Sequence, residues 1–184
     1  MYNEIKNRLK CELSEKRYNH TLAVQKLGEE LAVKYNISKE KATLACLLHD
    51  ITKEKNVEYQ LQILRNSDII IDNLWLKNTA LLHSVTASVV AKEYTSDKEI
   101  LDAIRYHTTG KADMTMLEKI VYVADACSYD RNYQDAETIR NTAFENIDKA
   151  LFLIASFTII SNVKKGKLID MQTINCYNDI LIRR

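Results

Sequence analysis

The chain has no proline and only three glycines in 184 residues. Tight β-hairpin turns usually depend on glycine at positive φ, so this scarcity argues against a hairpin-rich β protein. Apolar residues make up 46% of the chain, enough for one compact domain with its own core. We therefore predict an all-α fold in which residues 1–184 form a single domain. Its site-bearing core would span 15–131, with C-terminal helices from 136–182 packed on it.

The chain also lacks a surplus of charge, a long apolar run and a leader. The chain has 26 Lys and Arg residues and 25 Asp and Glu residues, so its net charge is close to zero. This balance predicts neither a nucleic-acid polymer nor a membrane as a partner. The longest apolar run, residues 151–160, is interrupted by Ser156 and Thr158 and is half of the roughly 20 residues that span a bilayer. The first residues show no apolar leader with a cleavage site, which predicts a cytoplasmic protein with reduced cysteines.

Cysteines are few and widely separated. They are Cys11, Cys46, Cys127 and Cys176, and none belongs to a C-x-x-C pair. Neither a zinc knuckle nor a redox motif is therefore indicated. We predict that the four side chains act as small buried apolar groups.

Helical periodicity covers most of the chain. The predicted helices span 2–12, 15–36, 39–52, 56–65, 73–94, 97–107, 115–128, 136–145, 147–165 and 172–182. Plausible N-caps precede four of them: Ser14, Ser38, Asp97 and Thr115. Gly110 and Gly166 stand where two helices should end.

The segment "LLHDITK", residues 47–53, sets two polar residues beside an apolar stripe. The stripe consists of Leu44, Leu47, Leu48 and Ile51. A buried carboxylate is costly unless it is paired, hydrogen-bonded or bound to a metal. For His49 and Asp50 alone, a salt-bridged aspartate and a boundary histidine would be a sufficient explanation.

The remaining histidines favour a metal site. His20, His83 and His107 also lie on predicted helices or at their ends, beside apolar residues, and Asp125 lies on an otherwise apolar helix. Neutral imidazole and carboxylate are the usual ligands of iron, manganese and zinc. Six such groups exceed the four of a closed zinc site, whereas two ions that share a carboxylate would use all six.

Asp50 is the natural bridge between two ions. Adjacent residues on a helix diverge by about 100°, so His49 and Asp50 can reach neighbouring ions. Two ions about 3.5–4 Å apart can hold a hydroxide between them and clamp a phosphoryl group. This arrangement predicts a hydrolase.

The ordered motifs resemble those of the YqeK-type HD-domain family, the bacterial symmetrical diadenosine tetraphosphate hydrolases. They are "RYNHTLAV", "LLHDITK", "LLHS", "AIRYHTTG", "MTMLEKIVYVAD" and the later Arg131. Together they run from residue 17 to 131 and are far more specific than a lone His-Asp pair. The resemblance implies a helical domain with a nucleotide substrate, a dinucleoside polyphosphate.

The resemblance also implies a mechanism and a set of site residues. A metal-bridging hydroxide would attack a β-phosphate of diadenosine tetraphosphate and release two ADP. The two metal ions would be iron, with manganese or zinc as alternatives. One ion would be bound by His20, His49, Asp50 and Asp125, and Asp50 would bridge to a second ion on His83 and His107. Asp50, Lys53 and Arg131 would act in catalysis, and the phosphates would contact Lys53, Thr108, Thr109, Gly110 and Arg131.

One segment departs from the family pattern. The chain reads "ADACSYDR" where the family usually reads "ADYIEPNR", so Ser128 and Tyr129 replace a glutamate and a proline. This change can alter hydrogen bonding around the ligands and the substrate preference. Arg131 could instead form an exposed salt bridge with Asp130 or Asp135.

Other interpretations remain open at this stage. The residues that flank two histidines, Arg17, Tyr18, Arg105 and Tyr106, are expected to pack rather than to act. The chain could be another HD phosphohydrolase for nucleoside mono- or triphosphates, a non-catalytic nucleotide-binding module, or an adaptor whose histidines belong to the core. The apolar C-terminal helix could cover its own core or a second copy in a homodimer.

Overall fold

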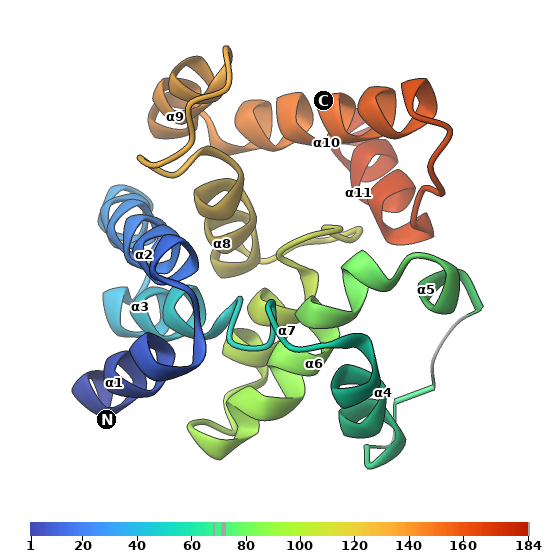
Figure 1. Cartoon of the computed structure of the whole chain (residues 1–184). Helices are drawn as coiled ribbons and strands as arrows, with labels where there is room; N and C mark the ends of the chain where they lie inside the picture. The colour runs from blue at the N-terminus through green and yellow to red at the C-terminus, as the bar shows by residue number, and fades with distance from the viewer. Residues whose placement is uncertain (68, 71–72, 184) are drawn as a thin grey trace.

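The computed structural model describes residues 1–67, 69–70 and 73–183. Within these ranges it contains eleven α-helices, two short 3-10 helices and no strand (Figure 1). The α-helices are α1 (Tyr2–Glu12), α2 (Glu15–Lys34), α3 (Lys39–Leu48), α4 (Val57–Arg65), α5 (Asn73–Lys77), α6 (Leu82–Val90), α7 (Lys98–Tyr106), α8 (Met116–Cys127), α9 (Ala136–Glu145), α10 (Ile147–Lys164) and α11 (Met171–Ile182). The 3-10 helices are η1 (Thr79–Leu81) and η2 (Ala91–Glu93). The all-α prediction is confirmed.

The predicted N-caps mark the starts of four helices. Ser14, Ser38, Asp97 and Thr115 each accept a hydrogen bond from a main-chain N–H two or three residues later. Thr115 also forms a reciprocal capping box with Glu118 at the start of α8. These side chains satisfy N–H groups that have no partner inside the helix.

The three glycines serve two purposes. Gly110 and Gly166 have φ of 65° and 59° and lie just after α7 and α10, as the sequence predicts. Gly28 lies inside α2, where an added Cβ would collide with the sulfur of Cys46 on α3. The missing side chain therefore lets α2 and α3 pack closely. Candidate site residues lie on α2 and directly after α3.

Two predicted helices are wrong in extent. Helix α3 ends at Leu48, and the chain continues in tight turns, with Ile51 N–H donating to the Leu48 carbonyl at 3.2 Å. The predicted helix 73–94 is divided into α5, η1, α6 and η2, with a break at Asn78, where φ is −121° and ψ is 64°. The apolar residues keep a helical spacing through both segments. The backbone nevertheless departs from a continuous helix, because tertiary contacts override local propensity; one of them is the hydrogen bond that the Thr52 hydroxyl donates to the His83 carbonyl (2.9 Å).

The core lies where α2, α3, α7 and α8 meet. Helix α2 packs on α3 and α8, and α7 packs on α3, α6 and α8. Leu27, Leu47, Ile104 and Val121, one from each of the four helices, are fully buried. Helix α10 contacts α8, α9 and α11, which places the C-terminal helices against one side of this core (Figure 1). The assignment of residues 1–184 to one domain stays a prediction.

Three of the four cysteines are buried, as predicted: Cys46, Cys127 and Cys176. The prediction is wrong for Cys11, which is exposed near the end of α1. Helix α1 buries Ile5 and Leu9 and turns its opposite face outward. Among the described residues, no helix has the length and apolar character that a membrane span requires.

Candidate metal centre

The structure brings the six predicted metal ligands together from three helices and from the ends of two others. His20 lies on α2, His49 and Asp50 directly follow α3, His83 lies on α6, His107 directly follows α7, and Asp125 lies on α8. Each imidazole ring lies beside the next: the ring centroids are 5.8 Å apart for His20 and His49, 4.9 Å for His49 and His107, and 5.1 Å for His83 and His107. The four histidines and Asp50 are at most 3% exposed, whereas the Asp125 side chain is 20% exposed. The cluster is therefore deep, and it meets solvent near Asp125.

Three histidines are oriented by the main chain. Each has its Nδ1 close to a carbonyl oxygen three residues earlier, which can only accept a hydrogen bond. The pairs are His49 with Cys46 (2.6 Å), His83 with Ala80 (2.7 Å) and His107 with Ile104 (2.7 Å). Nδ1 must therefore carry the proton, and Nε2 is left with a lone pair that faces the cluster.

The carboxylate of Asp50 faces two groups of ligands. Its Oδ2 lies 3.4 Å from His49 Nε2, while its Oδ1 lies 3.4 Å from His83 Nε2 and 3.6 Å from His107 Nε2. We call His20, His49, Asp125 and Asp50 Oδ2 the carboxylate half of the cluster. We call His83, His107 and Asp50 Oδ1 the imidazole half.

Asp125 completes the carboxylate half. Its Oδ1 lies 2.9 Å from His20 Nε2 and 4.0 Å from His49 Nε2. The ligand atoms lie within 4.8 Å of one another in three overlapping groups: His20 with His49 and Asp50, Asp50 with His83 and His107, and His49 with His107 and Asp125. The first two groups lie within one half each and are compact enough for a single ion, and the third joins the two halves.

Unsatisfied buried atoms show that a metal fits this donor set. His49 Nε2 and Asp50 Oδ1 are buried and have no hydrogen-bond partner among the residues that the structure describes. Such groups cost about 1–3 kcal/mol each when they are left unpaired. Both atoms carry a lone pair that can bind a metal and that faces the cluster, and bound cations would satisfy both at once.

Electrostatics keep the ligands in states that bind metal. Burial alone would raise the pKa of Asp50, but the imidazoles of His49, His107 and His83 that face its carboxylate hold this pKa well below its usual value. Burial likewise opposes the lowered pKa of Asp125, which a hydrogen bond from His20 produces. Burial, Lys53 and His107 lower the pKa of His83 to about 3. At neutral pH the two carboxylates are ionised and His83 is neutral, as coordination requires.

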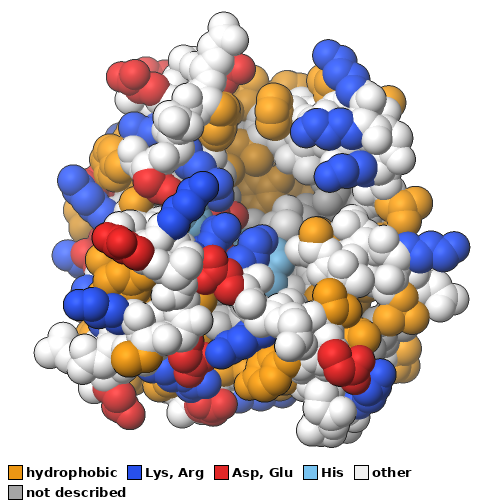
Figure 2. All heavy atoms as spheres, in the orientation of Figure 1, with side chains coloured by type: hydrophobic (Ala, Val, Ile, Leu, Met, Phe, Trp, Pro, Cys, Tyr) orange, Lys and Arg blue, Asp and Glu red, His pale blue; other side chains and the backbone are white. Residues whose placement is uncertain are grey.

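Basic side chains surround the cluster, and Figure 2 shows lysine and arginine side chains beside a hollow in which histidine is visible. Lys53 Nζ lies 3.1 Å from His83 Nε2, and burial lowers the pKa of this lysine. Arg131 Nη2 lies 2.8 Å from Asp125 Oδ1, and its Nε donates to the Asp125 carbonyl at 3.0 Å. The exposed pair of Arg131 with Asp130 or Asp135 considered from the sequence is replaced by this contact.

The turn after His107, formed by Thr108, Thr109 and Gly110, contacts the cluster through one of its three residues. Thr108 Oγ1 lies 3.2 Å from His83 Nε2. Thr109 is buried and donates to the Gly110 carbonyl, and a Cβ on Gly110 would meet Cys176 Sγ at 2.7 Å. Of the three residues, Thr108 alone has a contact with a histidine of the cluster.

Sequence reasoning missed two residues of the site. Arg17 was expected to pack, but its Nη1 forms a 2.8 Å ion pair with Asp50 Oδ2. It precedes His20 by three residues on one helix, so a shared face was a usable signal. Asp130 Oδ2 lies 2.8 Å from His20 Nδ1, and this contact crosses 110 residues of sequence, beyond the reach of any local pattern.

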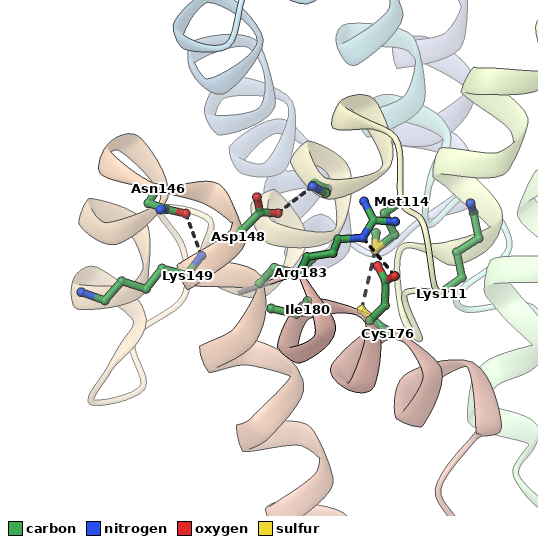
Figure 3. A pocket seen from close by; sticks show the side chains of 11 residues that line it. Lys111, Met114, Asn146, Asp148, Lys149, Cys176, Ile180 and Arg183 are labelled. Atoms are coloured by element: carbon green, nitrogen blue, oxygen red, sulfur yellow. Dashed lines mark hydrogen bonds and ion pairs between the residues drawn. The ribbon is translucent and has the colours of Figure 1, made fainter.

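A separate cavity of about 480 Å³ lies between α8, α10 and α11 (Figure 3). None of the six cluster residues lines it. Its basic side chains are partly neutralised, since Lys119 lies 2.6 Å from Asp148 and Arg183 lies 3.0 Å from Asp179. The cavity is therefore distinct from the candidate metal centre.

Comparisons with known proteins agree with this geometry. The family model described as HD domain matches residues 17–130, which contain all six cluster residues. A symmetrical bis(5'-nucleosyl)-tetraphosphatase of Staphylococcus aureus is 34% identical over 172 residues, covering 92% of this chain and 89% of the relative. The enzyme of the same name from Bacillus subtilis is 34% identical over 175 residues, covering 92% of each.

A solved structure extends the agreement to the fold. It is described as a predicted HD superfamily hydrolase involved in NAD metabolism from Clostridium acetobutylicum. The TM-score is 0.97 at 34% identity, with 100% of this chain and 98% of that chain covered. The chain belongs to the HD-domain family, in the group that contains the symmetrical bis(5'-nucleosyl)-tetraphosphatases.

Proposed function

We propose that this chain is a metal-dependent hydrolase that cleaves diadenosine tetraphosphate symmetrically into two ADP. The observation that carries the proposal is the orientation of Asp50, whose two oxygens face different sets of histidines. The named activity of the Staphylococcus aureus and Bacillus subtilis relatives supports the choice of substrate.

Metal ligation in this proposal follows the two halves of the cluster. His20, His49 and Asp125 would hold one ion, His83 and His107 would hold the second, and Asp50 would bridge them. Two ions bound there would supply a water-derived nucleophile at neutral pH and positive charge for the phosphate oxygens. The donor set suits iron and also manganese or zinc, and we propose iron.

The surrounding residues would bind and orient the polyphosphate. Arg131 presents a planar guanidinium beside Asp125, suited to two phosphate oxygens at once. Lys53 is a point charge next to the imidazole half, and Thr108 offers a hydroxyl on the same side. Water would attack the β-phosphorus, and the bond to the oxygen between the β- and γ-phosphates would break, releasing two ADP. Arg131 and Lys53 would stabilise the charge on the departing oxygen.

A product assay tests the proposal. Iron-loaded protein is incubated with diadenosine tetraphosphate, and the products are separated by chromatography. ADP as the sole product supports the proposal, whereas AMP with ATP, or no hydrolysis, contradicts it. Pyridine dinucleotide is the comparison substrate, because the Clostridium acetobutylicum protein is described as involved in NAD metabolism. Asp148→Asn, which alters a carboxylate paired with Lys119 away from the cluster, should leave the rate unchanged.

A further inference from the structure

His20 differs from the other three histidines in how its ring is oriented. His49, His83 and His107 donate from Nδ1 to a carbonyl three residues earlier in their own helical segment. His20 Nδ1 instead meets a side chain, the carboxylate of Asp130, at 2.8 Å. Its Nε2 faces Asp125 Oδ1 at 2.9 Å. Asp130 therefore takes the place that the helix backbone takes elsewhere in the cluster.

Asp130 is itself held in position. The hydroxyl of Ser128 donates to Asp130 Oδ1 at 2.6 Å, which leaves Oδ2 for His20. The N–H of Arg131 donates to the Ser128 carbonyl at 2.9 Å and closes a tight turn around Asp130. One carboxylate oxygen is thus anchored within the turn, and the other is directed at the imidazole.

The turn that carries Asp130 is fixed to the helices around it, although the chain has no proline to stiffen it. The charged groups of Lys26 and Arg140 each lie 4.7 Å from the ring centroid of Tyr129, and the Tyr129 hydroxyl donates to Glu30. Arg140 also donates from Nε to the Cys127 carbonyl at 2.7 Å, at the end of α8. Contacts to α2 and α9 therefore maintain the position from which Asp130 reaches His20.

We propose that Asp130 is a positioning residue that keeps the proton of His20 on Nδ1 when a metal is bound, so that a metal ion in the carboxylate half can replace the Asp125 contact of Nε2 and take its lone pair. This inference rests on the proposed metal-dependent function. A carboxylate partner orients a metal-binding imidazole and strengthens it as a ligand. The ion of the carboxylate half depends on Asp130, and the ion of the imidazole half does not, because His83 and His107 have main-chain partners.

Two variants of Asp130 separate its charge from its shape. Asp130→Ala removes the acceptor, and Asp130→Asn keeps an amide oxygen that can accept from Nδ1–H. The matched control is Asp135→Ala, an exposed aspartate five residues later that makes no capping hydrogen bond at the start of α9. Circular dichroism and thermal unfolding establish that each variant is folded.

The first measurement uses zinc alone as a diamagnetic probe. Titration of metal-free protein with zinc should show that Asp130→Ala weakens one of two binding steps by about 10- to 100-fold. Asp130→Asn should recover part of this loss, and Asp135→Ala should bind as the unmodified chain does. Equal affinity of the Asp130→Ala and unmodified chains for both ions would overturn the inference.

The second measurement reports the tautomer directly. Nitrogen-15 NMR of the histidine side chains should show all four rings protonated at Nδ1 in the unmodified zinc-loaded protein. In Asp130→Ala, the His20 signals alone should change, and the other three rings serve as internal references. An unchanged His20 spectrum would contradict the inference.

The two readouts separate this inference from the proposed function. An unmodified chain that binds zinc but does not cleave diadenosine tetraphosphate would reject the substrate and leave the role of Asp130 measurable. An unmodified chain that binds no metal would reject both.

Discussion

The two halves of the cluster differ in what they offer an ion. The carboxylate half combines two imidazoles with oxygens of Asp50 and Asp125, and these carboxylates also pair with Arg17 and Arg131. The imidazole half has two imidazoles and one oxygen of Asp50, and its neighbours are Lys53 and Thr108.

This difference suggests that the two halves have different roles, one in binding a metal tightly and the other in binding the substrate. Four ligands with two negative charges should bind an ion tightly in the carboxylate half. Three ligands leave more coordination positions free in the imidazole half, where a lysine and a hydroxyl can meet a phosphate. We therefore expect the carboxylate half to fill first and the imidazole half to receive the substrate.

Loss of the residue shared by the two halves should have the largest effect. Asp50→Asn removes the bridging charge, so we expect both ions to bind weakly and kcat to fall by about 10³-fold or more. Metal content and hydrolysis of diadenosine tetraphosphate are measured in parallel, with Asp148→Asn as the control. Normal turnover by the metal-free variant would contradict the role of Asp50 as the residue that both halves share.

Lys53 tests whether the imidazole half faces the substrate. Lys53→Met keeps most of the side-chain length and removes the charge, so kcat/KM should fall by about 100-fold. Metal affinity should be maintained or increased, because a cation beside His83 opposes the binding of another cation. A variant that loses metal along with activity would assign Lys53 to the structure of the site rather than to the substrate.

Lowering the pH should reduce the unfolding free energy of the metal-free protein, and His83 in the imidazole half should make the first contribution. The pKa of His83 is lowered to about 3, against about 6.5 in the unfolded chain. Between these values the unfolded chain binds a proton that the folded chain does not, so stability falls as pH falls. From pH 7 to 5 this costs about 2 kcal/mol. The lowered pKa values of Asp50 and Asp125 act at lower pH, because their contribution persists until the pH falls to about 4, where unfolded carboxylates protonate.

Urea unfolding of metal-free protein at pH 7 and pH 5 measures this effect. His83→Gln removes the titrating group, so its unfolding free energy should change less between the two pH values than that of the unmodified chain. An identical pH dependence in both proteins would contradict the assignment of the acid effect to His83.

Thr108 should show the smallest effect. Thr108→Val preserves the shape and removes one hydroxyl near His83, worth about 1 kcal/mol if it binds phosphate. KM should rise about fivefold with little change in kcat. Thr109→Val is the control, because the Thr109 hydroxyl contacts the Gly110 carbonyl instead. Equal effects of the two variants would remove the reason for preferring Thr108.

The helical fold and the candidate ligands could be predicted from the sequence because they depend on local patterns. Apolar periodicity and caps such as Thr115 located the helices, and the order of His20, His49-Asp50 and Asp125 indicated a shared site. The end of α3 at Leu48 could not be predicted, since the apolar stripe runs on to Ile51.

The division of the cluster into halves was also beyond the sequence. It depends on which oxygen of Asp50 faces which imidazole, a result of how α3, α6 and α7 pack. The pairing of His20 with Asp130 likewise requires α2 to lie beside the segment after α8. Tertiary packing decides such contacts, and residue order alone contains no local signal for them.

Anomalous X-ray diffraction from crystals of the iron-loaded protein tests the central claim most directly. The account predicts two peaks about 3.5–4 Å apart, one beside His20, His49 and Asp125 and the other beside His83 and His107, with one Asp50 oxygen on each. A single peak, or both Asp50 oxygens on the same ion, would contradict it.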